Sequence, residues 1–98
     1  MPGQASVVGD GAGAGYSVNL GWDCLSSGGP GPGNAEYADA FDRLLMPIAE
    51  QFRPELVIVS AGFDSALGDP EGECRCTPDG YAWMTSRLMG LADGKVVV

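Results

Sequence analysis

The residues with the clearest chemical potential lie in one acidic stretch, residues 60–73 (SAGFDSALGDPEGE). Four carboxylates fall within ten residues of it, and no basic residue follows them until Arg75: these acids are Asp64, Asp69, Glu71 and Glu73. Carboxylates this close repel one another unless water, turn donors or a bound cation stabilises them. The stretch therefore predicts either that Asp64 faces a metal ion or that it belongs to a solvated acidic turn, and the residue types alone leave both open.

Asp64 comes shortly after an uninterrupted apolar run, residues 56–59 (LVIV), which is bounded by Pro54 and Gly62. Such a run is typical of a strand that is covered on both faces in a parallel sheet. Ligands of open parallel sheets bind at the carboxyl ends of the strands. Asp64 is therefore placed where a sheet of this kind would bind a ligand.

Two amphipathic helices are predicted on either side of this strand. The first begins at Asn34 as its cap, carries an apolar stripe at helical spacing, is expected to kink at Pro47, and closes at Arg53-Pro54. The second begins at residues 77–79 (TPD), which supply a cap, a proline and an acid in the first turn. It is expected to end at Gly94.

Short strands at residues 16–20 and 96–98 complete the order strand, helix, strand, helix, strand. This order predicts an α/β fold with a parallel sheet and helices on its faces. Three strands cannot cover both faces of a central strand well, so the chain is expected to be a piece of a larger α/β domain. Residues 1–15 are rich in glycine without periodicity and are predicted to form a flexible loop.

The composition excludes several classes of function. The 98 residues contain no histidine, which removes histidine-dependent nucleophilic catalysis and any zinc site that includes histidine from this chain. A formal net charge of −8 without a basic cluster argues against a direct nucleic-acid or membrane partner. Three cysteines, Cys24, Cys74 and Cys76, supply neither a disulfide framework nor the four ligands of a structural zinc site.

The sequence shows neither a signal-peptide pattern nor an apolar run long enough for a membrane helix. It is therefore expected to belong to an intracellular protein of the nucleus and/or cytoplasm.

Several motifs together resemble the zinc-dependent histone deacetylase family, and its class II branch in particular. They are SAGFDSALGDPEG, the preceding ELVIVSAGFD and the following TPDGYAWMTSRLMGLADGKVVV. GYSVNLGW and NAEYADAFDRLLMPIAEQFRPEL resemble the family's upstream strand and helix, so the resemblance covers residues 7–98. It implies the arginase/deacetylase α/β fold, of which residues 16–98 would be a C-terminal-side portion truncated at both ends.

The resemblance also implies a role for Asp64, the aspartate of the GFD motif, as one of three zinc ligands. In the family the other two ligands belong to an Asp-x-His motif, the general base to a His-His pair, and the tyrosine that polarises the acetyl carbonyl to a Gly-Gly-Tyr motif. None of these motifs occurs in the chain. The implied reaction is hydrolysis of an acetamide by metal-activated water, in an acetylated protein such as a histone tail, and the isolated chain is expected to be inactive.

Glu71 follows Asp64 by seven residues, at the position that lies at the mouth of the family's substrate tunnel. Many class II members carry leucine there, and a carboxylate resembles the gatekeeper of the polyamine deacetylase branch. This implies acetylpolyamine as an alternative substrate, unless the glutamate is only a polar variant of the loop. A third interpretation is a stand-alone, non-catalytic binding module that keeps part of the fold. The first two interpretations imply the rest of a deacetylase domain as a partner.

Overall fold

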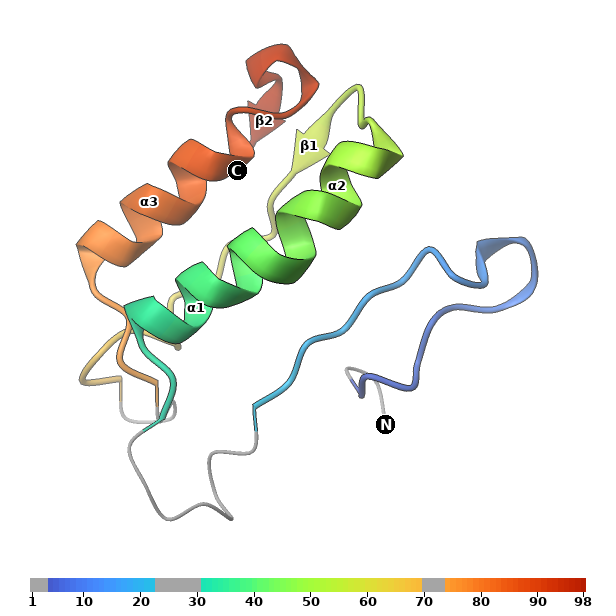
Figure 1. The fold of residues 1–98 in the computed structure, drawn as a ribbon. Helices are drawn as coiled ribbons and strands as arrows, with labels where there is room; N and C mark the ends of the chain where they lie inside the picture. The colour runs from blue at the N-terminus through green and yellow to red at the C-terminus, as the bar shows by residue number, and fades with distance from the viewer. Residues whose placement is uncertain (1–3, 23–30, 70–73) are drawn as a thin grey trace.

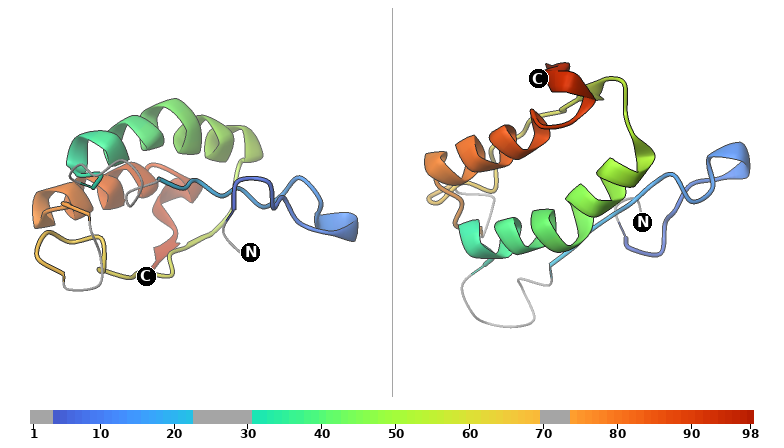
Figure 2. Two further views of the ribbon diagram at one scale, coloured as in Figure 1. Left: turned by 90° about the horizontal axis from the view of Figure 1, so that it is seen from below. Right: turned by 45° about the horizontal axis from the view of Figure 1, so that its top comes forward.

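The computed structural model describes residues 4–22, 31–69 and 74–98. Two helical segments lie side by side, and a pair of short strands lies on one side of them (Figures 1 and 2). In chain order the elements are the 3₁₀ turn η1 (Gly11–Gly13), α1 (Asn34–Ala40), the π-helical segment η2 (Phe41–Leu45), α2 (Met46–Phe52), β1 (Val57–Ile58), α3 (Pro78–Leu88), the 3₁₀ turn η3 (Ala92–Gly94) and β2 (Val96–Val97).

The strand pair confirms the predicted parallel sheet. β1 and β2 run parallel with Val57 opposite Val96 and Ile58 opposite Val97. The Val59 N–H donates to the carbonyl of Val97 at 2.7 Å. Because α3 lies between these strands in the chain, they form a βαβ unit, which is the connection expected for parallel neighbours.

The predicted strand at residues 16–20 is wrong. Over the ranges that the structure describes, this segment joins no ladder; the Ser17 N–H donates to the Val8 carbonyl at 3.3 Å and the Asn19 amide to the Val7 carbonyl at 2.8 Å. It runs along α2, on the side away from α3 (Figure 1). A strand needs a partner that presents free backbone groups, and here the nearest element is a helix whose groups bond internally.

The N-cap of the first helix lies one residue earlier than predicted, and α1 begins at Asn34 itself. Gly33 is the N-cap, and its N–H donates to the Glu36 carboxylate at 2.9 Å. This backbone bond lowers the pKa of Glu36, since it stabilises the charged carboxylate. Asn34 instead directs its side chain to the start of the other helix, where Oδ1 accepts from the Thr77 N–H at 3.0 Å and Nδ2 donates to Thr77 Oγ1 at 2.7 Å. The asparagine therefore joins two helices.

The expected irregularity around Pro47 takes the form of a widened turn just before it. The segment η2 has π-helical bonding, and the Met46 N–H donates to the carbonyl of Phe41, five residues earlier. Proline has no N–H to donate, so the α-helical bonding pattern is interrupted there. The helix ends where predicted, since Arg53 adopts the left-handed conformation (φ 55°) directly before Pro54.

The second helix starts at Pro78 after its N-cap Thr77, as predicted, but it ends at Leu88 and not at Gly94. The Leu91 N–H bonds to the Leu88 carbonyl at 3.0 Å, which tightens the last turn and directs the Leu91 side chain inward, where it is 7 % exposed. The turn η3 then reverses the chain toward β2, with positive φ at all three of its residues.

The buried apolar core is small. In the described part of the chain, the hydrophobic side chains that are buried belong to Met46, Cys76 and Leu91. Ile58 in the middle of the sheet is 74 % exposed and Phe52 at the end of α2 is 64 % exposed. The coverage of β1 on both faces, which the apolar run predicts, is therefore not provided by these residues. No helix in the described ranges is long and apolar enough to cross a membrane.

Gly80, in the first turn of α3, lies buried directly against the Asn34 side chain, and a Cβ at this position would overlap Asn34 Oδ1. Gly80→Ala should displace the asparagine and break its two bonds to Thr77, lowering the free energy of unfolding by about 2 kcal/mol in the whole protein. Denaturant unfolding measures this loss. Gly13→Ala is the matched control, because nothing lies within 4 Å of a Cβ there; equal stability of the two variants would contradict the prediction.

Candidate metal site

Asp64 lies in a loop that follows the carboxyl end of β1. We call residues 60–69 the Asp64 loop. The Asp64 carboxylate is exposed, and among the described residues it has no hydrogen-bond or ion-pair partner. A carboxylate at this end of a parallel strand, turned to solvent and not used by the fold, is free to bind a cation.

The segment 74–76 (CRC) fastens the Asp64 loop to the body of the protein. Ala66 and Cys76 form a parallel bridge, in which the Cys76 N–H donates to the Ser65 carbonyl at 3.0 Å and the Leu67 N–H donates to the Cys76 carbonyl at 2.8 Å. Through Arg75, the same segment pairs with Gly33 at the start of α1. The loop is thereby tied, across three residues, to the entry of the first helix.

The Arg75 side chain strengthens this connection. Its Nε donates to the Gly31 carbonyl at 2.8 Å, and its Nη2 lies 3.9 Å from Glu36 Oε1. Both charged side chains are 45 % exposed, so the ion pair contributes little by itself. The bond to the carbonyl is the more specific of the two, because it fixes where the segment 74–76 crosses the start of α1.

Beside the Asp64 loop lies a group of hydroxyls and thiols from four parts of the chain. We call it the hydroxyl–thiol cluster, and its members are Tyr37, Ser65, Cys74, Cys76 and Tyr81. Ser65 Oγ and the Tyr81 hydroxyl are 2.5 Å apart, and the Tyr37 hydroxyl donates to Cys74 Sγ at 3.9 Å. The loop, α1 and α3 therefore meet in one polar network.

Burial keeps two members of the cluster, Tyr37 and Cys76, protonated at neutral pH. Burial raises the pKa of Tyr37 to about 12, with a hydrogen bond from Ser65 acting in the opposite direction. Burial also raises the pKa of the Cys76 thiol, and Cys76 is only 1 % exposed. A protonated, buried thiol is neither a good nucleophile nor a metal ligand. Cys76 thus packs as a small apolar side chain, which is the role that the sequence favours for it.

Asp64 is the described residue that the sequence predicts as a metal ligand. Within the part of the chain that the structure describes, no three histidine, cysteine or acidic side chains gather in a way that could hold a metal ion. A catalytic zinc site takes three protein ligands. The exposed Asp64 carboxylate is compatible with one such ligand, while the described residues by themselves do not form a complete site.

One predicted residue of the site lies outside the described residues. It is Glu71, the expected substrate-contacting residue, and its role stays a prediction. Cys24, which the sequence assigns to no site, also lies outside them.

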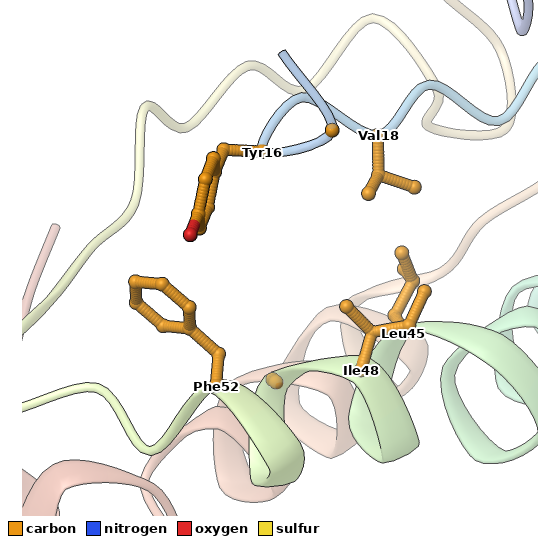
Figure 3. A pocket seen from close by; sticks show the side chains of 7 residues that line it. Tyr16, Val18, Leu45, Ile48 and Phe52 are labelled. Carbon is orange, nitrogen blue, oxygen red and sulfur yellow. The ribbon is translucent and has the colours of Figure 1, made fainter. Parts of the chain in front are cut away.

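A cavity of about 250 Å³ lies between the helices and the Asp64 loop, lined by Phe41 and Met84 on the helices and by residues 59–63 on the strand and loop. A second cavity, of about 280 Å³, lies between the segment at Tyr16 and helix α2 (Figure 3). There the Tyr16 and Phe52 rings meet edge to face at 6.3 Å between centroids. Among the described residues, neither lining includes an acid or a cysteine, but the first cavity is lined by both chain neighbours of Asp64, Phe63 and Ser65.

The family model for the histone deacetylase domain matches residues 1–98. The chain belongs to the histone deacetylase family. It is 52 % identical over 93 residues to "Polyamine deacetylase HDAC10" of Homo sapiens and 50 % identical over 96 residues to "Histone deacetylase clr3" of Schizosaccharomyces pombe. These matches cover 95 % and 98 % of this chain but 13 % of each relative. The class II-like resemblance is thereby confirmed.

Solved deacetylase structures share the fold. The structure of the histone deacetylase Clr3 matches 97 % of this chain with a TM-score of 0.89 and 50 % identity, over 15 % of its own length. The HDA15 HD domain matches 98 % with a TM-score of 0.88 and 47 % identity, over 26 % of its length. The predicted α/β deacetylase fold is confirmed, and this histone deacetylase segment spans a minor share of each relative.

Sequence reasoning missed the residues that hold the Asp64 loop in place. The sequence predicts no role in the site for Ser65 or Tyr81, and the bond between them joins residues sixteen positions apart. The available signal was a serine directly after the candidate ligand and a tyrosine in the first turns of the next helix. Nothing in the spacing of these residues shows that their hydroxyls meet.

Proposed function

We propose that this chain forms part of the catalytic domain of a zinc-dependent protein lysine deacetylase and contributes Asp64 as one ligand of the metal. The observation that carries the proposal is the exposed, unpartnered Asp64 carboxylate, on a loop fastened at the carboxyl end of a parallel strand, in a member of the histone deacetylase family. A carboxylate in such a place supplies a negatively charged oxygen ligand without any rearrangement of the fold.

The proposed reaction is hydrolysis of the acetamide of acetyl-lysine, as in a histone tail. When bound, zinc supplies Lewis acidity to the acetamide carbonyl and lowers the pKa of water. Asp64 holds one coordination position and offsets part of the ion's charge, while its loop keeps that oxygen in place. The other two protein ligands, the general base and the carbonyl-polarising donor come from residues outside these 98, because the chain has no histidine and its described part no second ligand group.

An acetylpolyamine is the second candidate substrate. Two observations favour it: the 52 % identity to a protein named polyamine deacetylase, and the carboxylate of Glu71 seven residues after Asp64. A negative charge at a tunnel mouth attracts a flexible substrate that carries ammonium groups along its length. The charges of a histone tail are arranged differently from those of a polyamine. A change of this one side chain can therefore separate the activities on the two substrates.

The partners that follow from the proposal are the acetylated substrate and the rest of the deacetylase domain. The match to histone deacetylases supports a place inside the cell, in the nucleus and/or cytoplasm, where acetylated histones and polyamines occur.

The test compares the whole protein with the 98-residue chain alone. In the whole protein we expect release of acetate from an acetyl-lysine histone peptide that is lost on chelation of zinc and restored by adding zinc. The chain alone should show no release and should bind zinc weakly, because one carboxylate cannot replace three ligands. A whole protein that is folded and zinc-free, with no activity on either substrate, would favour the non-catalytic binding module instead.

A further inference from the structure

Both chain neighbours of Asp64 contact the same side chain of α3. The rings of Phe63 and Tyr81 meet edge to face, with centroids 5.1 Å apart and planes at 80°. On the other side of Asp64, Ser65 Oγ is 2.5 Å from the Tyr81 hydroxyl. One tyrosine thus holds the residue before the carboxylate by its ring and the residue after it by its hydroxyl.

Tyr81 is well placed to do this because it stands on a regular helix. Its N–H donates to the Thr77 carbonyl at 3.1 Å, and its carbonyl accepts from Thr85 Oγ1 at 2.8 Å. Ser65 is held in addition through its backbone, whose carbonyl accepts from the Cys76 N–H. The contact therefore joins a rigid element to a loop residue that is already fastened on one side.

The loop needs such a restraint. Asp64 itself has no partner among the described residues, and the loop contains Gly62 and Gly68, the latter in a conformation with φ of 92°. A metal ligand must be held within a fraction of an ångström of its productive position, and the residues that orient it decide much of the metal affinity. Tyr81 is the side chain in the described part of the protein that restrains both flanks of Asp64.

We propose that Tyr81 is a positioning residue for the metal site, acting through Ser65 and Phe63 on the orientation of Asp64. The inference rests on the proposed role of Asp64 as a zinc ligand. It predicts that loss of the Tyr81 hydroxyl weakens zinc binding although that hydroxyl does not touch the metal.

The experiment is a double-mutant cycle on zinc affinity in the whole protein, with Tyr81→Phe, Ser65→Ala and the double variant. Each single change removes one partner of the same hydrogen bond and should raise the zinc dissociation constant about tenfold. The double variant should be no weaker than the weaker single variant, because the bond is lost only once. Ser65→Thr keeps a hydroxyl and should restore affinity close to the original value.

Two further measurements separate positioning from general destabilisation. Tyr16→Phe makes the same chemical change on a tyrosine that is 74 % exposed and lies against α2, and it should leave zinc affinity unchanged. Thermal unfolding of the zinc-free variants reports stability alone. If Tyr81→Phe unfolds, Ser65→Ala and Ser65→Thr still decide the question, since both act at the other end of the bond.

Each outcome distinguishes the two proposals. Zinc affinity within twofold of the original for Tyr81→Phe and Ser65→Ala, together with loss of zinc in Asp64→Asn, overturns the positioning role and leaves the proposed function standing. Effects of the two single changes that multiply in the double variant also overturn it. Unchanged zinc content in Asp64→Asn overturns the proposed function itself.

Discussion

Asp64→Asn in the whole protein should abolish deacetylation of every substrate and remove most of the bound zinc. The amide has the same size as the carboxylate but no charge, so the loop keeps its shape while the metal loses an anionic ligand. A loss of at least about a thousandfold in kcat/KM is expected, which corresponds to about 4 kcal/mol of transition-state stabilisation. Acetate release and zinc content of the purified variant measure the two effects.

The control for this prediction is Asp93→Asn, which neutralises another exposed carboxylate. Asp93 lies in η3 with φ of 53°, a conformation that asparagine also tolerates, and it is remote in sequence from the Asp64 loop. Its zinc content and activity should equal those of the unchanged protein. An Asp64→Asn variant that retains full zinc and more than a tenth of the activity would rule out the ligand assignment.

Glu71→Leu should leave zinc content unchanged and shift substrate preference away from acetylpolyamine and toward acetyl-lysine peptide. We propose that this carboxylate meets the distal cationic end of the substrate and not the reacting acetyl group. The attraction between one carboxylate and one ammonium in a partly solvated tunnel mouth is on the order of 1–3 kcal/mol, so the ratio of the two kcat/KM values should move roughly ten- to a hundredfold.

Glu71→Gln separates charge from size in this experiment, since it keeps the length of the side chain and removes only the charge. It should reproduce most of the shift if attraction is the cause. A change of less than about threefold in both variants would place Glu71 on the surface and leave protein deacetylation as the remaining substrate proposal.

The local elements of this protein follow from its sequence. The apolar run around β1, the cap, proline and acid at the start of α3, and the valines of β2 each carry a signal within a few residues, and the parallel pairing of Val57 with Val96 follows from their order. Asp64 could be singled out for the same reason, since its place after an apolar strand is a matter of chain order.

The tertiary structure decided where side chains are used. Residues 16–20 alternate like a strand, yet they lie along α2, a helix whose backbone groups bond internally and cannot pair with a strand. The sequence predicts Asn34 as a helix cap, yet its side-chain amide forms hydrogen bonds with Thr77 because the neighbouring helix starts beside it. The sequence predicts a helix end at Gly94, yet α3 ends at Leu88 and the Leu91 side chain is buried in the core.

The contacts that hold Asp64 were likewise decided by the tertiary structure. Ser65 and Tyr81 are sixteen positions apart and carry no motif, and their hydroxyls meet only because segment 74–76 brings the loop against α3. The chain order thus predicts which residue is placed to bind a metal, since the position of a residue after a strand depends on its neighbours in sequence. Which residues orient that carboxylate depends on contacts between distant segments, and only the folded chain decides those.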